Sequence, residues 1–231
     1  MEKTVFLDLI ERHLGTQLVR YQLQFFFNSS RYLAVSCPRR GGKSFITNLD
    51  ALYTCTEPNK RVVIILPNQT SVEAAIRNIR RMTEALDGYV EIANTIRTTI
   101  FFNNGSTIYL LSGNAVLENY RGCRFNKAII EEPDYIKNIE ELMTTLELCT
   151  LEFPDAQLKM IGTHSATKHN LKSYMLNPYY EKIIVTAHSI YNPMSRERLN
   201  EIESTMDSDR FSLEYLNEIT PSLFERLTTT N

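Results

Sequence analysis

The chain has 231 residues, of which 43% are hydrophobic and 23% are charged. These values exclude a disordered or low-complexity polymer and indicate one domain with a substantial core, without room for two full-sized catalytic domains. Twenty-five Lys and Arg residues against 27 Asp and Glu residues give a net charge of −2. This balance excludes a strongly basic protein that binds nucleic acid over its whole surface, so any contact with DNA must be local.

The cysteines and the N-terminal segment indicate a protein of a reducing compartment. Cys37, Cys55, Cys123 and Cys149 lie far apart and form no CxxC pair and no metal-ligand spacing with histidine. Such isolated cysteines predict a reduced intracellular protein. Charges interrupt the first 15 residues, and no apolar run approaches the roughly 20 residues of a membrane span. We therefore expect no signal peptide and no membrane partner.

Short β-branched runs alternate with stretches of helical periodicity, which predicts an α/β fold with a mostly parallel central sheet flanked by helices. The predicted strands are residues 32–36, 61–66, 126–130, 157–162 and 182–187. Helices are predicted as crossover connections at residues 43–54, 69–86, 138–150 and 168–176. The runs 99–102 and 107–111 flank Asn103-Asn104-Gly105-Ser106 and predict a β-hairpin, so the sheet is expected to be mixed.

The two ends of the chain are predicted to be helical and to belong to a single domain over residues 1–231. Residues 1–30 form N-terminal helices, residues 31–190 the α/β core, and residues 191–231 a C-terminal helical segment. Phe25-Phe26-Phe27 is expected to pack in the core rather than to stack on a base. Ser195 is predicted to cap a helix, and a second short helix is predicted at 208–218.

The predicted strand at 32–36 leads into CPRRGGKS at residues 37–44, and a predicted helix follows. This order is typical of a phosphate-binding P-loop. Backbone N–H groups around Gly41 and Gly42 would surround the β-phosphate. Lys43 would contact the β- and γ-phosphate oxygens, and Ser44 would bind Mg²⁺. The pattern GxxxxGK[ST] has a glycine where this chain has Cys37, and the alternative interpretation is a basic turn without a ligand.

Arg39 and Arg40 lie in this loop, where small residues would suffice. A guanidinium that reaches the γ-phosphate would stabilise the charge that develops in phosphoryl transfer. The alternatives are solvated arginines or contacts with the acidic segment that follows the strand at 126–130. The sequence leaves open which of the two arginines contacts the phosphate.

The predicted strand at 126–130 ends in Glu131-Glu132-Pro133-Asp134. Carboxylates at the carboxyl end of a strand indicate a site. A P-loop enzyme needs one acid that holds Mg²⁺ and a neighbouring acid that orients or deprotonates the attacking water. Glu131 and Glu132 fit these two roles in that order. Without the P-loop upstream, a solvated acidic face would be the preferred interpretation.

In their order and spacing, these motifs resemble the ATPase domain of the large terminase subunit, the motor that packages DNA into tailed-phage and herpesvirus-type capsids. The resemblance covers nearly the whole chain. It rests on Tyr21-Gln22, PRRGGKS, Tyr120-Arg121-Gly122, IIEEPDYI, MIGTHS and RFSLEYLNEI. It implies a RecA-like P-loop NTPase of the additional-strand, catalytic-glutamate type that binds ATP and Mg²⁺ and hydrolyses ATP to ADP and phosphate.

The resemblance also implies roles for residues at the nucleotide. Gln22 is similar to the glutamine that reads the adenine base in this family. Arg39 is similar to the loop arginine proposed to sense or stabilise the γ-phosphate. Arg121 is similar to an arginine suggested to act on the ATP of a neighbouring subunit in a ring.

Two further motifs of the family have counterparts in this chain. Glu131 and Glu132 occupy the positions of the Walker B pair, with Glu131 in place of the usual Asp. Gly162, Thr163 and His164 match the coupling motif, which relays the nucleotide state to the region that grips DNA. The family more often has a Thr-Pro or similar pair in this motif, so the contribution of His164 is left open.

The helix predicted at 69–86 carries Arg77, Arg80 and Arg81, whose spacing of three and four residues places them on one side. Such a stripe can bind DNA phosphates without reading bases, which suits a motor that translocates DNA. The alternative is a solvated helix face.

The resemblance implies double-stranded DNA, a portal protein and a small terminase subunit as partners. It also implies a ring of identical subunits in the host cytoplasm, a pentamer when assembled and a monomer in isolation. Family members continue into an RNase H-like nuclease, which we expect to be absent here, so no nuclease activity is expected. Two other functions stay open: a nucleic-acid-stimulated ATPase of the helicase type, and a nucleotide-binding assembly module with little turnover.

Overall fold

An eight-stranded sheet forms the centre of the structure. Its strands are β1 (Tyr32–Ser36), β2 (Arg61–Leu66), β3 (Ile92–Ile96), β4 (Thr99–Phe102), β5 (Thr107–Ser112), β6 (Lys127–Glu131), β7 (Gln157–Gly162) and β8 (Glu181–Ile184). Their spatial order is β3-β4-β5-β2-β6-β7-β1-β8. The computed structural model describes residues 1–86, 88–113, 122–165, 168–187, 190 and 193–217.

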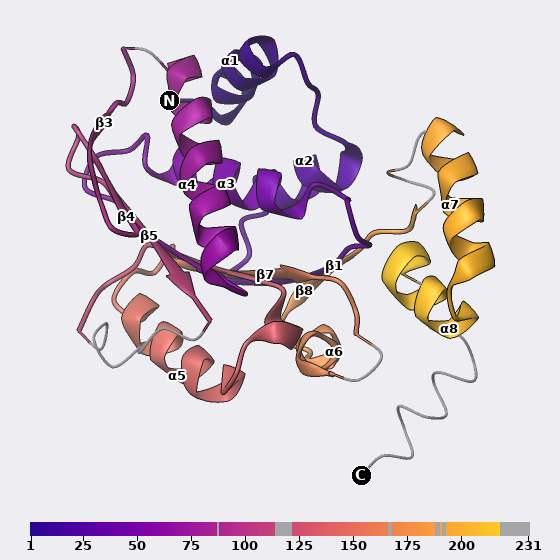
Figure 1. Ribbon diagram of the computed structural model, residues 1–231. Coiled ribbons are helices and arrows are strands. Elements are labelled where there is room, and N and C mark those ends of the chain that lie inside the picture. Colours follow the sequence, from indigo (N-terminus) through magenta and orange to yellow (C-terminus); the bar gives the residue numbers. More distant parts are fainter. Residues whose placement is uncertain (87, 114–121, 166–167, 188–189, 191–192, 218–231) are drawn as a thin grey trace.

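Helices cover both faces of this sheet (Figure 1). One face carries α1 (Lys3–Leu14), α2 (Arg20–Phe27), α3 (Lys43–Thr54) and α4 (Gln69–Thr83). The other face carries α5 (Ile139–Thr150) and α6 (Asn170–Leu176). None of the described helices has the length and apolar character that a membrane span requires. The predicted α/β fold with a mostly parallel, mixed sheet is confirmed, because among the described strands only the pairs β3–β4 and β4–β5 are antiparallel.

Strand β3 is absent from the sequence prediction. Its sequence, IANTI, has Asn94 and Thr95 side by side and mostly half-buried or exposed residues, so it lacks the apolar alternation that predicts a strand. It lies at the edge of the sheet and pairs only with β4, with an irregular register between Ile92 and Asn94. The backbone pairing with β4, a strand of the predicted hairpin, therefore makes this segment a strand, although its own sequence pattern does not predict one.

The C-terminal segment differs in detail from the prediction. Helix α7 (Pro193–Thr205) begins at Pro193, so the prediction of Ser195 as its N-cap is wrong. Proline is favourable in the first turn of a helix, where its missing N–H costs no hydrogen bond. The predicted helix at 208–218 is a short helix, α8 (Ser208–Phe211), that continues as a π-helical turn, η5 (Ser212–Leu216). Asn217 ends this turn in the left-handed region, at φ 60°.

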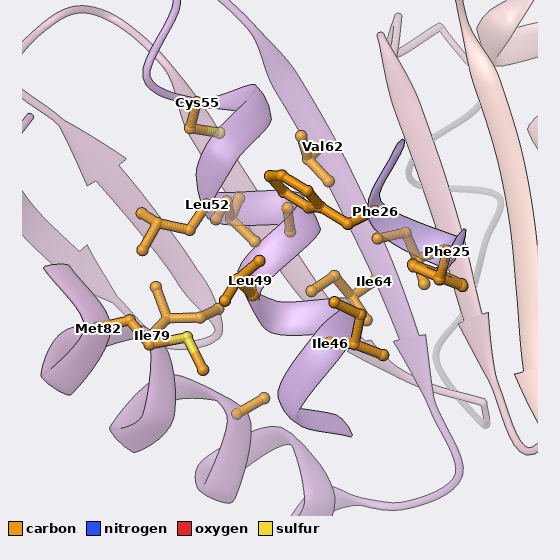
Figure 2. Close-up of a cluster of buried hydrophobic side chains, with 14 of the residues drawn as sticks. Phe25, Phe26, Ile46, Leu49, Leu52, Cys55, Val62, Ile64, Ile79 and Met82 are labelled. Atoms are coloured by element: carbon orange, nitrogen blue, oxygen red, sulfur yellow. The ribbon is translucent and has the colours of Figure 1, made fainter. Parts of the chain in front are cut away.

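The core lies in two layers, one on each face of the sheet. In β2, Val62 and Ile64 face the α1–α4 layer, whereas Val63 and Ile65 face the α5–α6 layer. Figure 2 shows the first layer, in which side chains of α2, α3 and α4 meet β2. Phe25 and Phe26 are buried there, as predicted, but Phe27 is 45% exposed.

The sheet order determines where functional side chains meet. Strand β7 lies between β1, which precedes the predicted P-loop, and β6, which ends in the acidic segment. The three strands are parallel, with Ser36 opposite Gly162 and Ile161 opposite Glu131. Their carboxyl ends therefore place the loop, the acids and the segment after β7 at one edge of the sheet.

Candidate active site

The predicted P-loop connects β1 to α3 and contains two residues with positive φ. Gly42 precedes α3 at φ 84° and Arg40 has φ 60°. Cys37, which replaces the first glycine of the motif, is fully buried, and burial raises the pKa of its thiol to about 11. A Cβ at position 41 would lie 2.4 Å from the Cys37 sulfur. Glycine at position 41 is therefore what makes room for the cysteine in this loop.

Helix α2 lies against this loop and bonds to its carbonyl groups. Tyr21 donates its hydroxyl to the Gly41 carbonyl at 2.5 Å, and Gln22 Nε2 donates to the Gly42 carbonyl at 3.3 Å. Gln22 Oε1 accepts a hydrogen bond from the backbone N–H of Val19 at 3.0 Å. Both ends of the Gln22 amide thus have protein partners, one of them in the P-loop.

Lys43 contacts residues from three different segments of the site. Its Nζ lies 3.2 Å from Glu132 Oε1 and donates to Thr163 Oγ1 at 2.7 Å. It also donates to the Pro38 carbonyl at 3.0 Å. The ammonium group therefore links the P-loop, the end of β6 and the segment after β7.

Glu131 is buried beside the start of α3, with 3% of its surface exposed. It accepts a hydrogen bond from Ser44 at 2.6 Å and a very short one from Thr47. Burial raises the pKa of the Glu131 carboxyl, although the two hydroxyl donors act in the opposite direction. Thr47 was absent from the predicted site, but it lies one helical turn after Ser44 on the same side of α3, a spacing that could have indicated it.

Glu132 has a strained backbone, at φ 50°. Its Oε2 accepts a hydrogen bond from the backbone N–H of Thr163 at 2.9 Å. A Cβ at position 162 would lie 2.9 Å from Cδ of Pro133 and 3.3 Å from Cα of Glu132. Gly162 is therefore required where the two segments approach each other, which joins the predicted coupling motif directly to the predicted catalytic acid.

Asp134 provides a second connection between these segments. Its carboxylate accepts hydrogen bonds from the backbone N–H groups of Ser165, at 3.1 Å, and Leu171, at 2.9 Å. Burial raises the pKa of Asp134. Neighbouring His164 is partly buried, and burial, followed by the charge of Lys172, lowers its pKa to about 4. His164 is therefore neutral at pH 7.

A cavity of about 570 Å³ opens over the P-loop. It is lined by Arg39, Arg40, Gly41, Gly42, Lys43, Ser44, Phe45, Glu132 and Tyr215. This volume lies in the range of pockets for small ligands. Five of the six predicted nucleotide-binding residues, at positions 40–44, line the cavity, whereas Gln22 does not.

Arg39 also lines this cavity, but its guanidinium has a partner that the sequence did not indicate. Its Nε lies 2.8 Å from Glu214 Oε2, and its backbone N–H donates to the Glu214 carbonyl at 3.0 Å. Arg210 lies 3.0 Å from the other carboxylate oxygen of Glu214. The C-terminal turn η5 thus borders the cavity, and only folding brings this acid to the loop.

The three predicted DNA-contacting arginines are exposed on one side of α4. Arg77, Arg80 and Arg81 lie opposite the buried Val72 and Ile79. Within the described part of the chain, no carboxylate forms an ion pair with any of the three. Arg121, predicted to act on a neighbouring subunit, lies outside the described residues.

The donor set fits a magnesium ion rather than a transition metal. Ser44 and Glu131 present a hydroxyl and a carboxylate oxygen 2.6 Å apart, and Mg²⁺ prefers oxygen ligands. The described residues contain no group of three or more His, Cys, Asp or Glu side chains that could hold a metal. Mg²⁺ commonly takes only one or two protein ligands and completes its shell with water and phosphate.

One family model matches the sequence over half of the chain. The family model for the N-terminal part of the large terminase subunit of the T4-like virus type matches residues 35–150, half of the chain. No curated protein matches the sequence.

Solved structures of large terminases share the fold. The large terminase ATPase domain of Thermus phage P74-26 is 17% identical, with a TM-score of 0.71, over 89% of this chain and 95% of that chain. The HK97 bacteriophage large terminase is 14% identical, with a TM-score of 0.71, over 95% of this chain and 56% of that chain. The large terminase of a thermophilic bacteriophage, in complex with ADP, is 11% identical, with a TM-score of 0.65, over 87% of this chain and 53% of that chain.

The structural likeness shows a common fold, and the chain spans about half the length of the HK97 protein and of the thermophilic bacteriophage protein. The match of the family model goes further, because it includes the P-loop and the acidic segment. The chain belongs to the large terminase subunit family and matches the N-terminal part of that subunit.

Proposed function

We propose that the chain hydrolyses ATP to ADP and phosphate in the 570 Å³ cavity and uses the reaction to translocate double-stranded DNA into a procapsid. The observation that carries this proposal is the convergence of Lys43, Glu132 and Thr163 at one edge of the sheet. The large terminase of the thermophilic bacteriophage has been solved with ADP and with ATP-γ-S, which supports an adenine nucleotide as the ligand.

Ser44 and Glu131 would hold Mg²⁺ beside the phosphates, where the ion would neutralise their negative charge. Thr47 supports this role, since its hydroxyl fixes the second oxygen of the Glu131 carboxylate. Lys43 would contact the β- and γ-phosphate oxygens, and the N–H groups around Gly41 and Gly42 would bind the β-phosphate.

Glu132 would orient the attacking water for in-line displacement at the γ-phosphate and accept its proton. Two contacts hold its carboxylate in place: the Thr163 N–H on one oxygen and Lys43 on the other. A general base must be held at a fixed position relative to the reacting atoms. The strained backbone of Glu132 is consistent with such a role.

Two arginines would complete the nucleotide site. Arg39, at the cavity, would move from Glu214 to the γ-phosphate and stabilise the charge of the transition state. Arg40 would contribute a second positive charge at the same end. Arg121 would act on the ATP of a neighbouring subunit, as the family resemblance implies.

Coupling to DNA would run through Gly162, Thr163 and His164, because this segment is bonded directly to Glu132. The exposed arginines of α4 would contact DNA phosphates without base specificity. The partners would be a portal protein, a small terminase subunit and further copies of the chain in a ring, a pentamer by family resemblance. The assembly would form on the procapsid in the host cytoplasm.

Steady-state ATP hydrolysis by the purified chain, with and without Mg²⁺, tests the proposal, and DNA packaging into portal-bearing procapsids tests its coupling. We expect Mg²⁺-dependent turnover that Lys43→Ala abolishes, because the variant lacks the ammonium group that would contact the β- and γ-phosphate oxygens. Lys137→Ala, in an exposed lysine after η3 (Pro133–Tyr135), is the matched control. Turnover that is independent of Mg²⁺, or unchanged in Lys43→Ala, would contradict the proposal.

A further inference from the structure

Tyr21 has a place in the site that neither the motif nor the proposed roles explain. Its ring is buried, with 4% of the residue exposed, and it does not line the nucleotide cavity. Its hydroxyl donates to the Gly41 carbonyl at 2.5 Å from behind the loop. Burial raises the pKa of this hydroxyl, so the group stays protonated and donates at physiological pH.

The bond to Gly41 fixes one peptide plane of the P-loop. The C=O and N–H groups of a trans peptide point in opposite directions, so holding the Gly41 carbonyl toward Tyr21 turns the Gly42 N–H to the other side. Gly42 lines the nucleotide cavity. The peptide joins two glycines, which have the greatest backbone freedom and the lowest barrier to a flip of the plane. A bond to Tyr21 opposes such a flip.

Gln22 acts on the next carbonyl of the loop. The Gly42 carbonyl accepts from Gln22 Nε2 at 3.3 Å and also from the backbone N–H of Ile46 at 3.2 Å, as the first bond of α3. The amide of Gln22 cannot rotate freely, because its oxygen accepts from the Val19 N–H. A Cβ at position 42 would lie 2.6 Å from Gln22 Nε2, so the loop and the glutamine are in close contact.

Helix α2 is itself held at its far end. Its last carbonyl groups include those of Phe25 and Phe26, which accept hydrogen bonds from Lys159 at 2.9 Å and Lys3 at 2.7 Å. Positive charge at the carboxyl end of a helix is favourable. Lys159 is fully buried and lies 3.1 Å from Asp50 in α3, the helix that begins at the P-loop. Helix α2 is thus anchored to β7 and α3, and its first turn is placed firmly against the loop.

We propose that Tyr21 is a positioning residue for phosphate binding, which holds the Gly41–Gly42 peptide so that the Gly42 N–H faces the β-phosphate. Gln22 assists through the Gly42 carbonyl and acts on the loop rather than on the adenine base. This inference rests on the proposed function, because it assumes that the cavity binds a nucleoside triphosphate. It predicts that both residues affect the binding of phosphate groups and leave base recognition unchanged.

The experiment compares the affinities of the purified chain and its Tyr21→Phe variant for ATP, AMP and inorganic tripolyphosphate, by calorimetry or ligand-observed NMR. Because the variant loses one buried hydrogen bond from the hydroxyl to the loop, we expect its affinities for ATP and for tripolyphosphate to fall by about tenfold each. AMP, which has no β-phosphate, is expected to keep its affinity. Tyr53→Phe is the matched control, because it removes a hydroxyl that bonds to the Met1 carbonyl, far from the loop.

A second variant, Gln22→Met, separates the two roles of the glutamine. If Gln22 acts on the loop, ATP and GTP lose affinity by the same factor. A loss confined to ATP would mean that Gln22 reads adenine and would overturn this part of the inference.

The outcomes for Tyr21→Phe are also distinct. Affinities for ATP and tripolyphosphate within twofold of the parent chain would overturn the inference and leave the proposed function intact. An equal loss for AMP would also overturn it, since it would indicate a general collapse of the pocket. If the parent chain bound neither ATP nor tripolyphosphate, the proposed function itself would fail.

Discussion

The carboxylate of Glu132 accepts a 2.9 Å hydrogen bond from the backbone N–H of Thr163. The predicted catalytic acid and the predicted coupling segment are therefore in direct contact, because β7 lies between the strands that carry the P-loop and the acids. Thr163 also bonds through its hydroxyl to Lys43 and to the Cys37 carbonyl. A loss of the γ-phosphate would therefore be transmitted to the segment after β7 through Thr163.

Thr163→Val keeps the shape of the side chain and removes both hydroxyl bonds. Because the Lys43 ammonium loses a partner, we expect kcat for ATP hydrolysis to fall by about tenfold. Thr163→Ser, which retains a hydroxyl, is the control and should keep more than half of the activity. Steady-state kinetics check this, and a valine variant with the kcat of the parent chain would separate Thr163 from the catalytic network.

Glu214→Gln removes the charge that pairs with Arg39 and Arg210 while preserving the size of the side chain. If Arg39 moves to the γ-phosphate, the carboxylate competes with the nucleotide for it. The Arg39 side chain is 45% exposed, so solvent weakens the pair and the expected gain in ATP affinity is about two- to fivefold. Arg39→Ala should instead lower kcat by at least about a hundredfold.

Binding titrations and turnover measured on the same preparations check both variants. Glu203→Gln, at an exposed position of α7, is the matched control for the loss of a negative charge. A decrease in ATP affinity in Glu214→Gln would indicate that Glu214 holds Arg39 ready for the nucleotide rather than competing with it.

His164 makes the free energy of unfolding depend on pH. Burial lowers its pKa from 6.5 to about 4, so the unfolded chain takes up a proton between these values that the folded chain does not. This contribution to the free energy of unfolding is fully present above pH 6.5, where His164 is neutral in both states, and it is lost as the pH falls toward 4. Between pH 7 and pH 5.5 the expected loss is about 1 kcal/mol.

Urea unfolding at the two pH values, in the parent chain and in His164→Gln, isolates this contribution. The variant should lose less stability on acidification than the parent chain does. Equal losses in the parent chain and His164→Gln would contradict the assignment.

The negative charge of Asp50 compensates the positive charges of two buried lysines, Lys127 and Lys159. It lies 2.8 Å from Lys127 and 3.1 Å from Lys159, and all three side chains are less than one tenth exposed. Burial alone would raise the pKa of Asp50, but the two ammonium groups outweigh it and lower the pKa. Asp50→Asn leaves these charges uncompensated, so we expect a loss of about 3–5 kcal/mol in the free energy of unfolding.

Chemical denaturation at pH 7 measures this loss. The double variant Asp50→Leu/Lys159→Met removes one charge of each sign and should recover part of the stability. A single variant within 1 kcal/mol of the parent chain, about the net worth of one hydrogen bond, would mean that water reaches the cluster.

The arginine stripe of α4 predicts a salt-sensitive, sequence-independent affinity for DNA. Replacing Arg77, Arg80 and Arg81 with Glu should weaken binding and reduce the slope of log affinity against log salt by about 2–3. The same change at Arg12, Arg20 and Arg198, exposed arginines of other helices, is the control. Fluorescence anisotropy over a range of salt concentrations measures both quantities, and an unchanged slope would show that the three arginines of α4 do not contact DNA.

Much of the fold follows from the sequence because its strands are continuous apolar runs. β1, β2 and β7 begin and end where the runs predict, since each is buried on both faces of the sheet. The loop and the acids also follow, because parallel strands bring their carboxyl ends to one edge. The local sequence pattern does not predict β3, because the position of this strand depends on its pairing with β4. It also does not predict where α7 begins, because Ser195 lies inside this helix rather than before it.

The remaining site residues depend on tertiary contacts. Glu214 reaches Arg39 from the far end of the chain, and no local spacing indicates this pairing. Tyr21 and Gln22 are recognisable as a motif in the sequence, but their bonds to the loop carbonyls depend on the position of α2, which the buried Lys159 helps to fix. Side chains that act through another residue are the part of a site that sequence motifs describe least.

In the proposed mechanism, Glu132 orients the water that attacks ATP. ATP binding and single-turnover hydrolysis by Glu132→Gln test this role, with Glu140→Gln, at an exposed position of α5, as the control. We predict that Glu132→Gln binds ATP within about threefold of the parent chain, while its hydrolysis rate falls by a factor of about 10²–10⁴. Hydrolysis by Glu132→Gln at the rate of the parent chain would show that Glu132 does not orient the attacking water.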